Sequence, residues 1–161
     1  MTSGVPTRSA GLLLFRRGDA GTEVLIGHMG GPFWAKRDEG GWSIFKGEYA
    51  DGEDPLAAAR REFQEETGSP APPGEPLELG EVRQSGGKRI VAWAIEADFD
   101  ASTVRSNTFE IEWPPRSGRR QAFPEIDRAE WFGLDDARRK LVKGQLPLLD
   151  ALAELVEPRA P

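Results

Sequence analysis

A short glutamate-rich segment constrains the fold of this chain most strongly. Residues Asp54 to Thr67 predict a helix, because Asp54 is a preferred N-cap residue and Pro55 suits the first helical position. Gly68 suits the end of the helix, and the prolines that follow it cannot continue one. At about 3.6 residues per turn, one apolar stripe consists of Leu56, Ala59, Phe63 and Thr67. We therefore expect this stripe to pack on a sheet.

An acidic stripe adjoins the apolar one and indicates a cation site. Glu62 and Glu66 are four residues apart, and Glu65 lies beside them. Like charges at this spacing repel and destabilise a helix, so a bound divalent cation with oxygen ligands is the natural compensation. An acidic helix face is otherwise usually just solvated. The surrounding sequence has to decide between these two interpretations.

Composition limits the class of protein. The chain has 161 residues, of which 38% are hydrophobic and 30% charged, as expected for one globular domain over residues 1–161. Residues 1–8 and 157–161 are predicted to be flexible ends. The absence of cysteine excludes disulfides, zinc-thiolate sites and thiol nucleophiles, and a single histidine excludes a multi-histidine metal site. A cysteine-free chain suits a cytoplasmic location.

Charge and hydropathy restrict the partners. The formal net charge of −6 does not favour a stable nucleic-acid complex, because general phosphate attraction requires a basic surface. No run of about eighteen apolar residues exists, so no membrane helix is expected, and the first ten residues lack the apolar stretch of a signal peptide. The charge is compatible with a substrate that is presented with a bound divalent metal, whose cation supplies the positive field, and we expect either a monomer or a homodimer.

Periodicity predicts an α/β or α+β sandwich. The expected strands are Ala10–Arg16, Glu23–His28, Leu79–Arg83, Arg89–Phe99 and Ala129–Phe132. Two further helices are expected at Leu134–Leu141 and Pro147–Val156. Residues 30–41 and 105–122 are predicted to be loops, because both are interrupted by glycine and proline.

The segment around the predicted helix resembles the Nudix box. The matching residues are Gly47, Glu53, Arg61, Glu62, Phe63, Glu65, Glu66 and Gly68. Seven fixed identities at roughly 7% frequency each match by chance on the order of once in 10⁸ starting positions. Ser69 departs from the pattern, which usually has an aliphatic residue there. The resemblance implies an α/β/α sandwich with a mixed central sheet on which the Nudix helix packs.

The resemblance extends beyond the box. Residues 9–15 are similar to the first strand of the family, and residues 131–137 to the strand-to-helix segment that follows the box. The run Trp42 to Glu48 resembles the branch that hydrolyses diadenosine polyphosphates and diphosphoinositol polyphosphates, except that Phe45 replaces a proline. Within that branch we place dinucleoside polyphosphates first as substrates, followed by nucleoside triphosphates and diphosphoinositol polyphosphates.

The resemblance also implies roles for the glutamates. Glu62 and Glu66 correspond to metal ligands, and Glu65 to a ligand or to the general base that deprotonates the attacking water. Arg61 would orient these side chains by ion pairing, and Glu53 would support the helix without binding the metal itself. The carbonyl of Gly47 is a further candidate metal ligand. Mg²⁺ is the expected ion, with Mn²⁺ as the alternative, because such ions neutralise phosphate charge and acidify bound water.

A further acid outside the box is expected. The candidates are Glu110, Glu112, Glu125 and Glu130. Glu125 is favoured as a metal ligand because it precedes the strand that leads to Trp131 and Phe132.

Candidate substrate contacts lie in and near the loops. Lys46 precedes Gly47 and is predicted to contact phosphate. Trp42 is either a core residue or a stacking platform for a base, and the loop position of Trp34 favours a ligand contact. His28 is predicted to be structural. The basic run at residues 116–120 is predicted to be solvated rather than to grip phosphates.

These features predict a Mg²⁺-dependent hydrolase that cleaves a phosphoanhydride bond in a nucleoside diphosphate linked to another group. A non-catalytic module that senses a nucleotide or RNA is the alternative, although such proteins usually lose box glutamates that this chain retains. A prenyl diphosphate isomerase is disfavoured, because that related family relies on a catalytic cysteine.

Overall fold

A computed structural model describes residues 8–156, apart from the side chain of Ser85. The ends predicted to be flexible, residues 1–8 and 157–161, lie outside this range except for Arg8. Arg8 belongs to the first strand.

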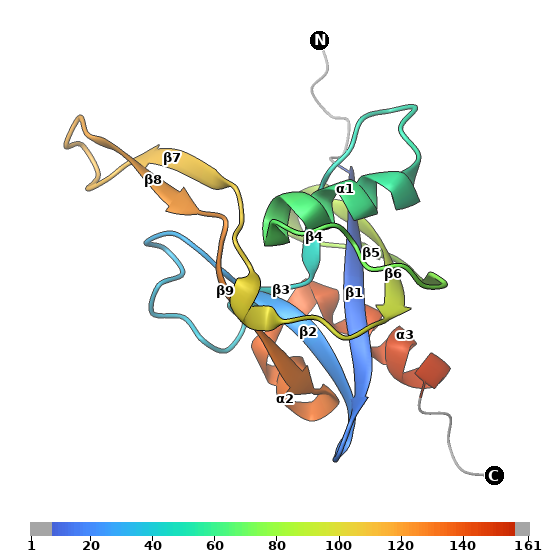
Figure 1. Ribbon diagram of the computed structural model, residues 1–161. Helices are drawn as coiled ribbons and strands as arrows, with labels where there is room; N and C mark the ends of the chain where they lie inside the picture. Colours follow the sequence, from blue (N-terminus) through green and yellow to red (C-terminus); the bar gives the residue numbers. More distant parts are fainter. Residues whose placement is uncertain (1–7, 157–161) are drawn as a thin grey trace.

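Seven strands form one mixed sheet (Figure 1). They are β1 (Arg8–Gly18), β2 (Gly21–Met29), β3 (Trp42–Ser43), β4 (Phe45–Glu48), β5 (Leu77–Arg83), β6 (Arg89–Glu96) and β9 (Ile126–Gly133). The strand order is β3-β2-β1-β6-β5, with β4 also paired to β1 and β9 to β2. Only β1 and β6 run parallel, whereas the other pairs are antiparallel. The mixed sheet expected from the family resemblance is confirmed.

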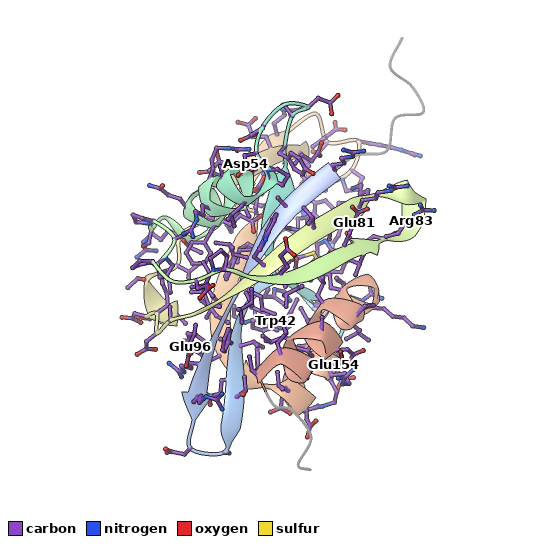
Figure 2. The ribbon with its side chains drawn as sticks, turned by 90° about the vertical axis from the view of Figure 1, so that its right-hand side faces the viewer. Trp42, Asp54, Glu81, Arg83, Glu96 and Glu154 are labelled. Atoms are coloured by element: carbon purple, nitrogen blue, oxygen red, sulfur yellow. The ribbon has the colours of Figure 1, made fainter. Side chains whose placement is uncertain are left out.

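Helices cover both faces of this sheet. The described helices are α1 (Pro55–Thr67), α2 (Leu134–Lys140) and α3 (Leu146–Val156), with short 3₁₀ turns η1 (Ser85–Gly87), η2 (Ala101–Thr103) and η3 (Lys143–Gln145). Figure 2 shows α1 and α3 on opposite sides of the strands. The α/β/α sandwich is thereby confirmed. None of the described helices is long and apolar enough to cross a membrane.

The alternation of side chains along β1 separates the core into two clusters. Leu12 and Leu14 face α1, where they join the buried Ala58, Ala59 and Phe63. The alternate residues Leu13 and Phe15 point to the other face of the sheet and pack with α3. The predicted run of consecutive apolar residues is therefore a strand buried on both faces.

The ends of α1 agree with the sequence signals. The Asp54 side chain accepts a hydrogen bond from the amide of Ala57 at 2.9 Å, and Gly68 adopts a left-handed conformation with φ of 80°. Phe63 is fully buried and makes edge-to-face contacts with Phe45 and Phe99, at ring-centroid distances of 5.5 and 5.4 Å. These contacts anchor the glutamate-bearing helix on the sheet.

The prediction of a loop over residues 105–122 is wrong. This region contains a separate two-stranded hairpin of β7 (Thr108–Glu112) and β8 (Arg120–Pro124), which projects from the main sheet (Figure 1). The prolines and glycine that indicated a loop all lie in the turn between the strands. The half-buried Phe109, Ile111 and Phe123 alternate with exposed residues, and this short period-two signal was outweighed by the turn residues.

Replacing Phe63 with alanine should destabilise the fold strongly. The substitution removes a fully buried ring and leaves a cavity between α1 and the sheet. We expect a loss of about 3–5 kcal/mol in the free energy of unfolding, measured by urea denaturation. Phe33→Ala is the matched control, because Phe33 is 73% exposed and should cost about 1 kcal/mol or less. Equal losses for the two variants would contradict this account of the core.

Candidate active site

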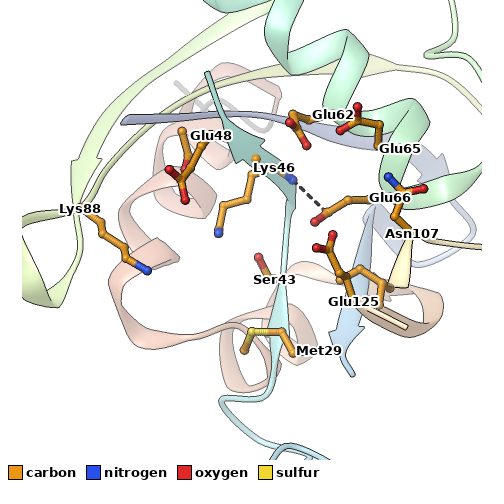
Figure 3. A pocket seen from close by; sticks show the side chains of 13 residues that line it. Met29, Ser43, Lys46, Glu48, Glu62, Glu65, Glu66, Lys88, Asn107 and Glu125 are labelled. Atoms are coloured by element: carbon orange, nitrogen blue, oxygen red, sulfur yellow. Dashed lines mark hydrogen bonds between the residues drawn. The ribbon is translucent and has the colours of Figure 1, made fainter. Parts of the chain in front are cut away.

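One pocket gathers the glutamates of α1 with residues from distant parts of the chain. It has a volume of about 420 Å³ and is lined by Glu62, Glu65 and Glu66 of α1, and by Glu125 just before β9. Lys46 of β4 also lines it. Figure 3 shows Lys46 on the opposite side of the pocket from Glu125. The pocket therefore combines a dense group of carboxylates with a cation.

Glu66 is the most buried of these carboxylates. Its side chain accepts a hydrogen bond from the backbone amide of Lys46 at 3.0 Å, and the residue is only 9% exposed (Figure 3). Burial raises the pKa of Glu66 to about 8, although the Lys46 amide and ammonium partly oppose this effect. A buried carboxyl of this kind binds a proton, or a cation in place of it, near neutral pH.

Glu62 lies against the backbone of Gly47. A β-carbon at residue 47 would lie 1.9 Å from a carboxylate oxygen of Glu62, so any larger residue would displace this carboxylate. Partial burial raises the pKa of Glu62 to about 7, and the neighbouring Glu65 adds to the increase. This contact gives a physical reason for the glycine that opens the Nudix box.

Arg61 connects the carboxylates from outside the pocket. Its Nε donates to Glu53 at 3.0 Å, and its Nη1 donates to Glu62 at 2.8 Å and to Glu65 at 3.4 Å. The second terminal nitrogen donates to the carbonyl of Glu48 at 3.4 Å. The adjacent Arg61 lowers the pKa of Glu53, which therefore remains charged. The structure thus contains the ion pairs with the helix glutamates that were expected of Arg61, and it adds a pair with Glu53.

Backbone hydrogen bonds bring Glu125 to the helix. The amide of Asn107 donates to the carbonyl of Glu65 at 3.0 Å, and the amide of Glu125 donates to the carbonyl of Asn107 at 2.9 Å. The carbonyl of Glu125 in turn accepts from Gly30 at 2.9 Å. Burial and the charge of Glu65 raise the pKa of Glu125.

The three other candidates for the additional acid lie outside the pocket. Glu110 pairs with Arg120 on the hairpin, and Glu112 accepts from the amide of Gly118. Glu130 faces Arg128 on β9. Of the four, the structure places only Glu125 beside the box glutamates.

The two candidate tryptophans differ in environment. Trp34 is half-buried and lines a second cavity together with Lys46. Trp42 is 1% exposed and packs edge-to-face on His28 and Phe132 in the core. The prediction that Trp42 contacts the substrate is therefore wrong, because its buried ring has no face free for a ligand. Trp42 follows the alternative interpretation, that of a core residue.

His28 is structural, as predicted. It is 1% exposed, and its ring nitrogens lie 2.9 Å from a carboxylate oxygen of Asp127 and 2.6 Å from the carbonyl oxygen of Arg37. The side chain thereby ties the loop over residues 30–41 to β9. It lies outside the carboxylate pocket.

The donor atoms of the pocket fit a hard divalent cation. Glu62, Glu65, Glu66 and Glu125 offer only oxygen ligands, which Mg²⁺ and Mn²⁺ prefer. As the side chains of the described residues are placed, no three carboxylate, histidine or cysteine groups converge on one metal position. Glu62 and Glu65 instead share Arg61 as a partner.

Several lining residues had no signal in the sequence. Asn107, Ser43 and Lys88 all line the pocket, yet none of them belongs to the box match or was a candidate site residue. Lys88 follows the η1 turn, and Figure 3 shows its side chain on the same side of the pocket as Lys46. Only the folding of the sheet brings these residues to the glutamates.

The NUDIX domain family model matches residues 5–152 of the chain. The protein therefore belongs to the Nudix family, whose enzymes are pyrophosphohydrolases that act on acid anhydrides. A comparison with curated protein sequences gives no match.

Solved structures show the same fold. An Ap4A hydrolase from C. elegans, in a binary complex, aligns with a TM-score of 0.65 and 20% identity, over 91% of this chain and 96% of its own. The NUDIX domain of Shewanella oneidensis NrtR, complexed with ADP ribose, aligns with a TM-score of 0.62 and 17% identity, over 94% and 88%. The E. coli ORF135 protein aligns at 0.58 and 18% identity, over 99% and 100%.

Gly47→Ala should leave the protein folded but impair the pocket. The added methyl group occupies the position of the Glu62 carboxylate, which must move. We expect Mg²⁺ affinity, measured by calorimetry, to fall about 10–100-fold, because Gly47 positions Glu62, a candidate metal ligand. Gly133→Ala is the control, because a β-carbon there meets no atom within 4 Å. Wild-type Mg²⁺ affinity in Gly47→Ala would show that the position of Glu62 does not matter.

Glu66→Gln should stabilise the metal-free protein at high pH. The pKa of Glu66 is raised to about 8 from 4.5, so the stability linked to its protonation is fully present below pH 4.5 and is lost progressively up to about pH 8. The amide does not titrate and retains an oxygen for the Lys46 amide. In urea denaturation with EDTA, we expect the variant to gain about 2–4 kcal/mol over wild type between about pH 5 and about pH 8.5. A difference that does not change with pH would contradict the burial argument.

Proposed function

We propose that this protein is a Mg²⁺-dependent hydrolase that cleaves a phosphoanhydride bond in a nucleoside diphosphate linked to another group. Dinucleoside polyphosphates are the leading substrates, followed by nucleoside triphosphates. The observation that carries this proposal is the gathering of Glu62, Glu65, Glu66 and Glu125 around one pocket with Lys46. Pockets of this composition suit phosphoryl chemistry, which requires positioning and charge neutralisation more than covalent catalysis.

Each residue of the pocket has a proposed role. Glu62, Glu66 and Glu125, together with the Gly47 carbonyl, are the metal ligands. A bound Mg²⁺ supplies charge neutralisation on phosphate oxygens and lowers the pKa of water. Glu65, which is more exposed than Glu66, accepts the proton of the attacking water or acts as a further ligand.

Two side chains support this arrangement by charge. Arg61 holds Glu62 and Glu65 in position and is itself held by Glu53. Lys46 reaches the same pocket from β4, where its ammonium binds a phosphate oxygen of the substrate. The positive charge of Lys46 also offsets part of the repulsion among the glutamates.

The structural relatives support a nucleotide-type substrate. One is an Ap4A hydrolase and another is a domain complexed with ADP ribose. Both resemblances lie below 25% identity, so they support the substrate class through the fold alone. Hydrolysis is favoured over sensing because the chain retains all of the box glutamates and has Glu62, Glu65 and Glu66 in one pocket.

Hydrolysis can be tested with a panel of diadenosine tetraphosphate, nucleoside triphosphates, ADP-ribose and other nucleotide sugars. With Mg²⁺, we expect at least one member of the panel to release a nucleotide product, which is measured by chromatography. Glu66→Gln should lower kcat by about 10³-fold or more, because it removes a buried metal ligand. After Mg²⁺ is removed from the wild-type enzyme with EDTA, added Mn²⁺ should restore its activity.

Glu154→Gln provides the matched control, because Glu154 is exposed on α3 (Figure 2) and the substitution makes the same chemical change away from the pocket. It should retain wild-type rates. If no panel member is hydrolysed while nucleotides still bind, the protein is a sensing module and the proposal is wrong.

A further inference from the structure

A second cavity adjoins the carboxylate pocket. It has a volume of about 680 Å³, and the two share Met29, Ser43, Lys46 and Lys88 as lining residues. A ligand held in the carboxylate pocket therefore has room to continue past Lys46. Trp34 and Val142 contribute apolar surface to this second cavity.

The charge of the second cavity is opposite to that of the first. Lys46, Lys88 and Lys143 line it, and none of the described residues that line it is acidic. We call it the lysine cavity. The ion pairs found within residues 8–156 all use other cations, so these three lysines are not neutralised by a salt bridge there. Three lysines without a salt bridge around one cavity are unexpected in a chain with a net charge of −6.

Packing holds the three lysines together although they come from distant segments. The buried side chain of Gln145 donates to Ser43 at 2.9 Å and accepts from the amide of Ile44 at 3.0 Å, which ties η3 to the segment before Lys46. This places Lys143, also in η3, near β4. The lysine cavity is therefore built on a fixed backbone.

A second contact brings Lys88 to the same place. A β-carbon on Gly144 would lie 3.1 Å from Cγ of Gln84, so η3 closely approaches the η1 turn. The amide of Gln84 donates to the carbonyl of Lys88 at 2.7 Å and closes that turn. Lys88 and Lys143 are thereby held on neighbouring segments.

We propose that the lysine cavity binds the distal phosphates of the substrate. It thereby selects a nucleotide whose phosphate chain continues beyond the cleaved bond over one that ends in a neutral sugar. Each ammonium group donates charge-assisted hydrogen bonds to phosphate oxygens, and several lysines together match an extended polyphosphate better than a single phosphate. This assignment rests on the proposed hydrolase function and adds Lys88 and Lys143 as specificity-determining residues.

Binding of inorganic tripolyphosphate in EDTA-containing, Mg²⁺-free buffer tests the cavity without turnover. By calorimetry at low ionic strength, Lys88→Ala/Lys143→Ala should bind tripolyphosphate at least about 10-fold more weakly than wild type. The control is Lys36→Ala/Arg83→Ala, which removes the same charge from exposed residues that line neither cavity. Its affinity should remain within about 2-fold of wild type.

Turnover provides a second measurement. The ratio of kcat/KM for diadenosine tetraphosphate to kcat/KM for ADP-ribose should fall at least about 10-fold in Lys88→Ala/Lys143→Ala, mainly through KM for the tetraphosphate. The control variant should keep the wild-type ratio.

The outcomes separate the two proposals. The proposal that the lysine cavity binds phosphates would be overturned by any of three results. These are an equal loss of tripolyphosphate binding in both double variants, no loss in either, and no binding by wild type. An unchanged substrate ratio would overturn its role in selection. If tripolyphosphate binds as expected but no substrate is hydrolysed, the cavity stands and the hydrolase proposal fails.

Discussion

The packing of Phe63 on the sheet is the interaction on which the rest of the site depends. Because this ring is fully buried against Phe45, α1 has one orientation, and the stripe next to Phe63 must face the end of β4. Phe45 stands where the resembling branch has a proline, and it belongs to this contact. Phe45 therefore contributes to core packing and does not line the pocket.

The site stores unfavourable electrostatics that a cation can relieve. Glu66 is buried with one backbone donor, and Glu62 and Glu65 depend on Arg61 for compensation. The raised pKa values of Glu62 and Glu66 express this cost, since proton uptake and metal binding both neutralise the carboxylates. The same carboxylates therefore lower the stability of the metal-free protein and would favour binding of a cation.

The two cavities divide the recognition of a substrate by charge. The carboxylate pocket suits phosphate that arrives with a metal ion, whereas the lysine cavity suits phosphate that arrives without one. Lys46 lines both and lies at the boundary between them. A phosphate chain that spans both cavities would meet complementary charge along its length, which a nucleotide with a short chain would not.

The sequence by itself determined α1, its caps and the grouping of Glu62, Glu65 and Glu66, because helical spacing converts sequence separation directly into proximity. The family resemblance also implied that Arg61 pairs with the glutamates of α1, which lie within about one turn of it, whereas its pair with Glu53 was not predicted. The tertiary structure decided what depends on contacts between distant segments. These contacts bury Trp42, join Glu125 to α1 and bring Lys88 and Lys143 to Lys46. Local periodicity carries no information about such contacts, since they are set by sheet order and loop closure.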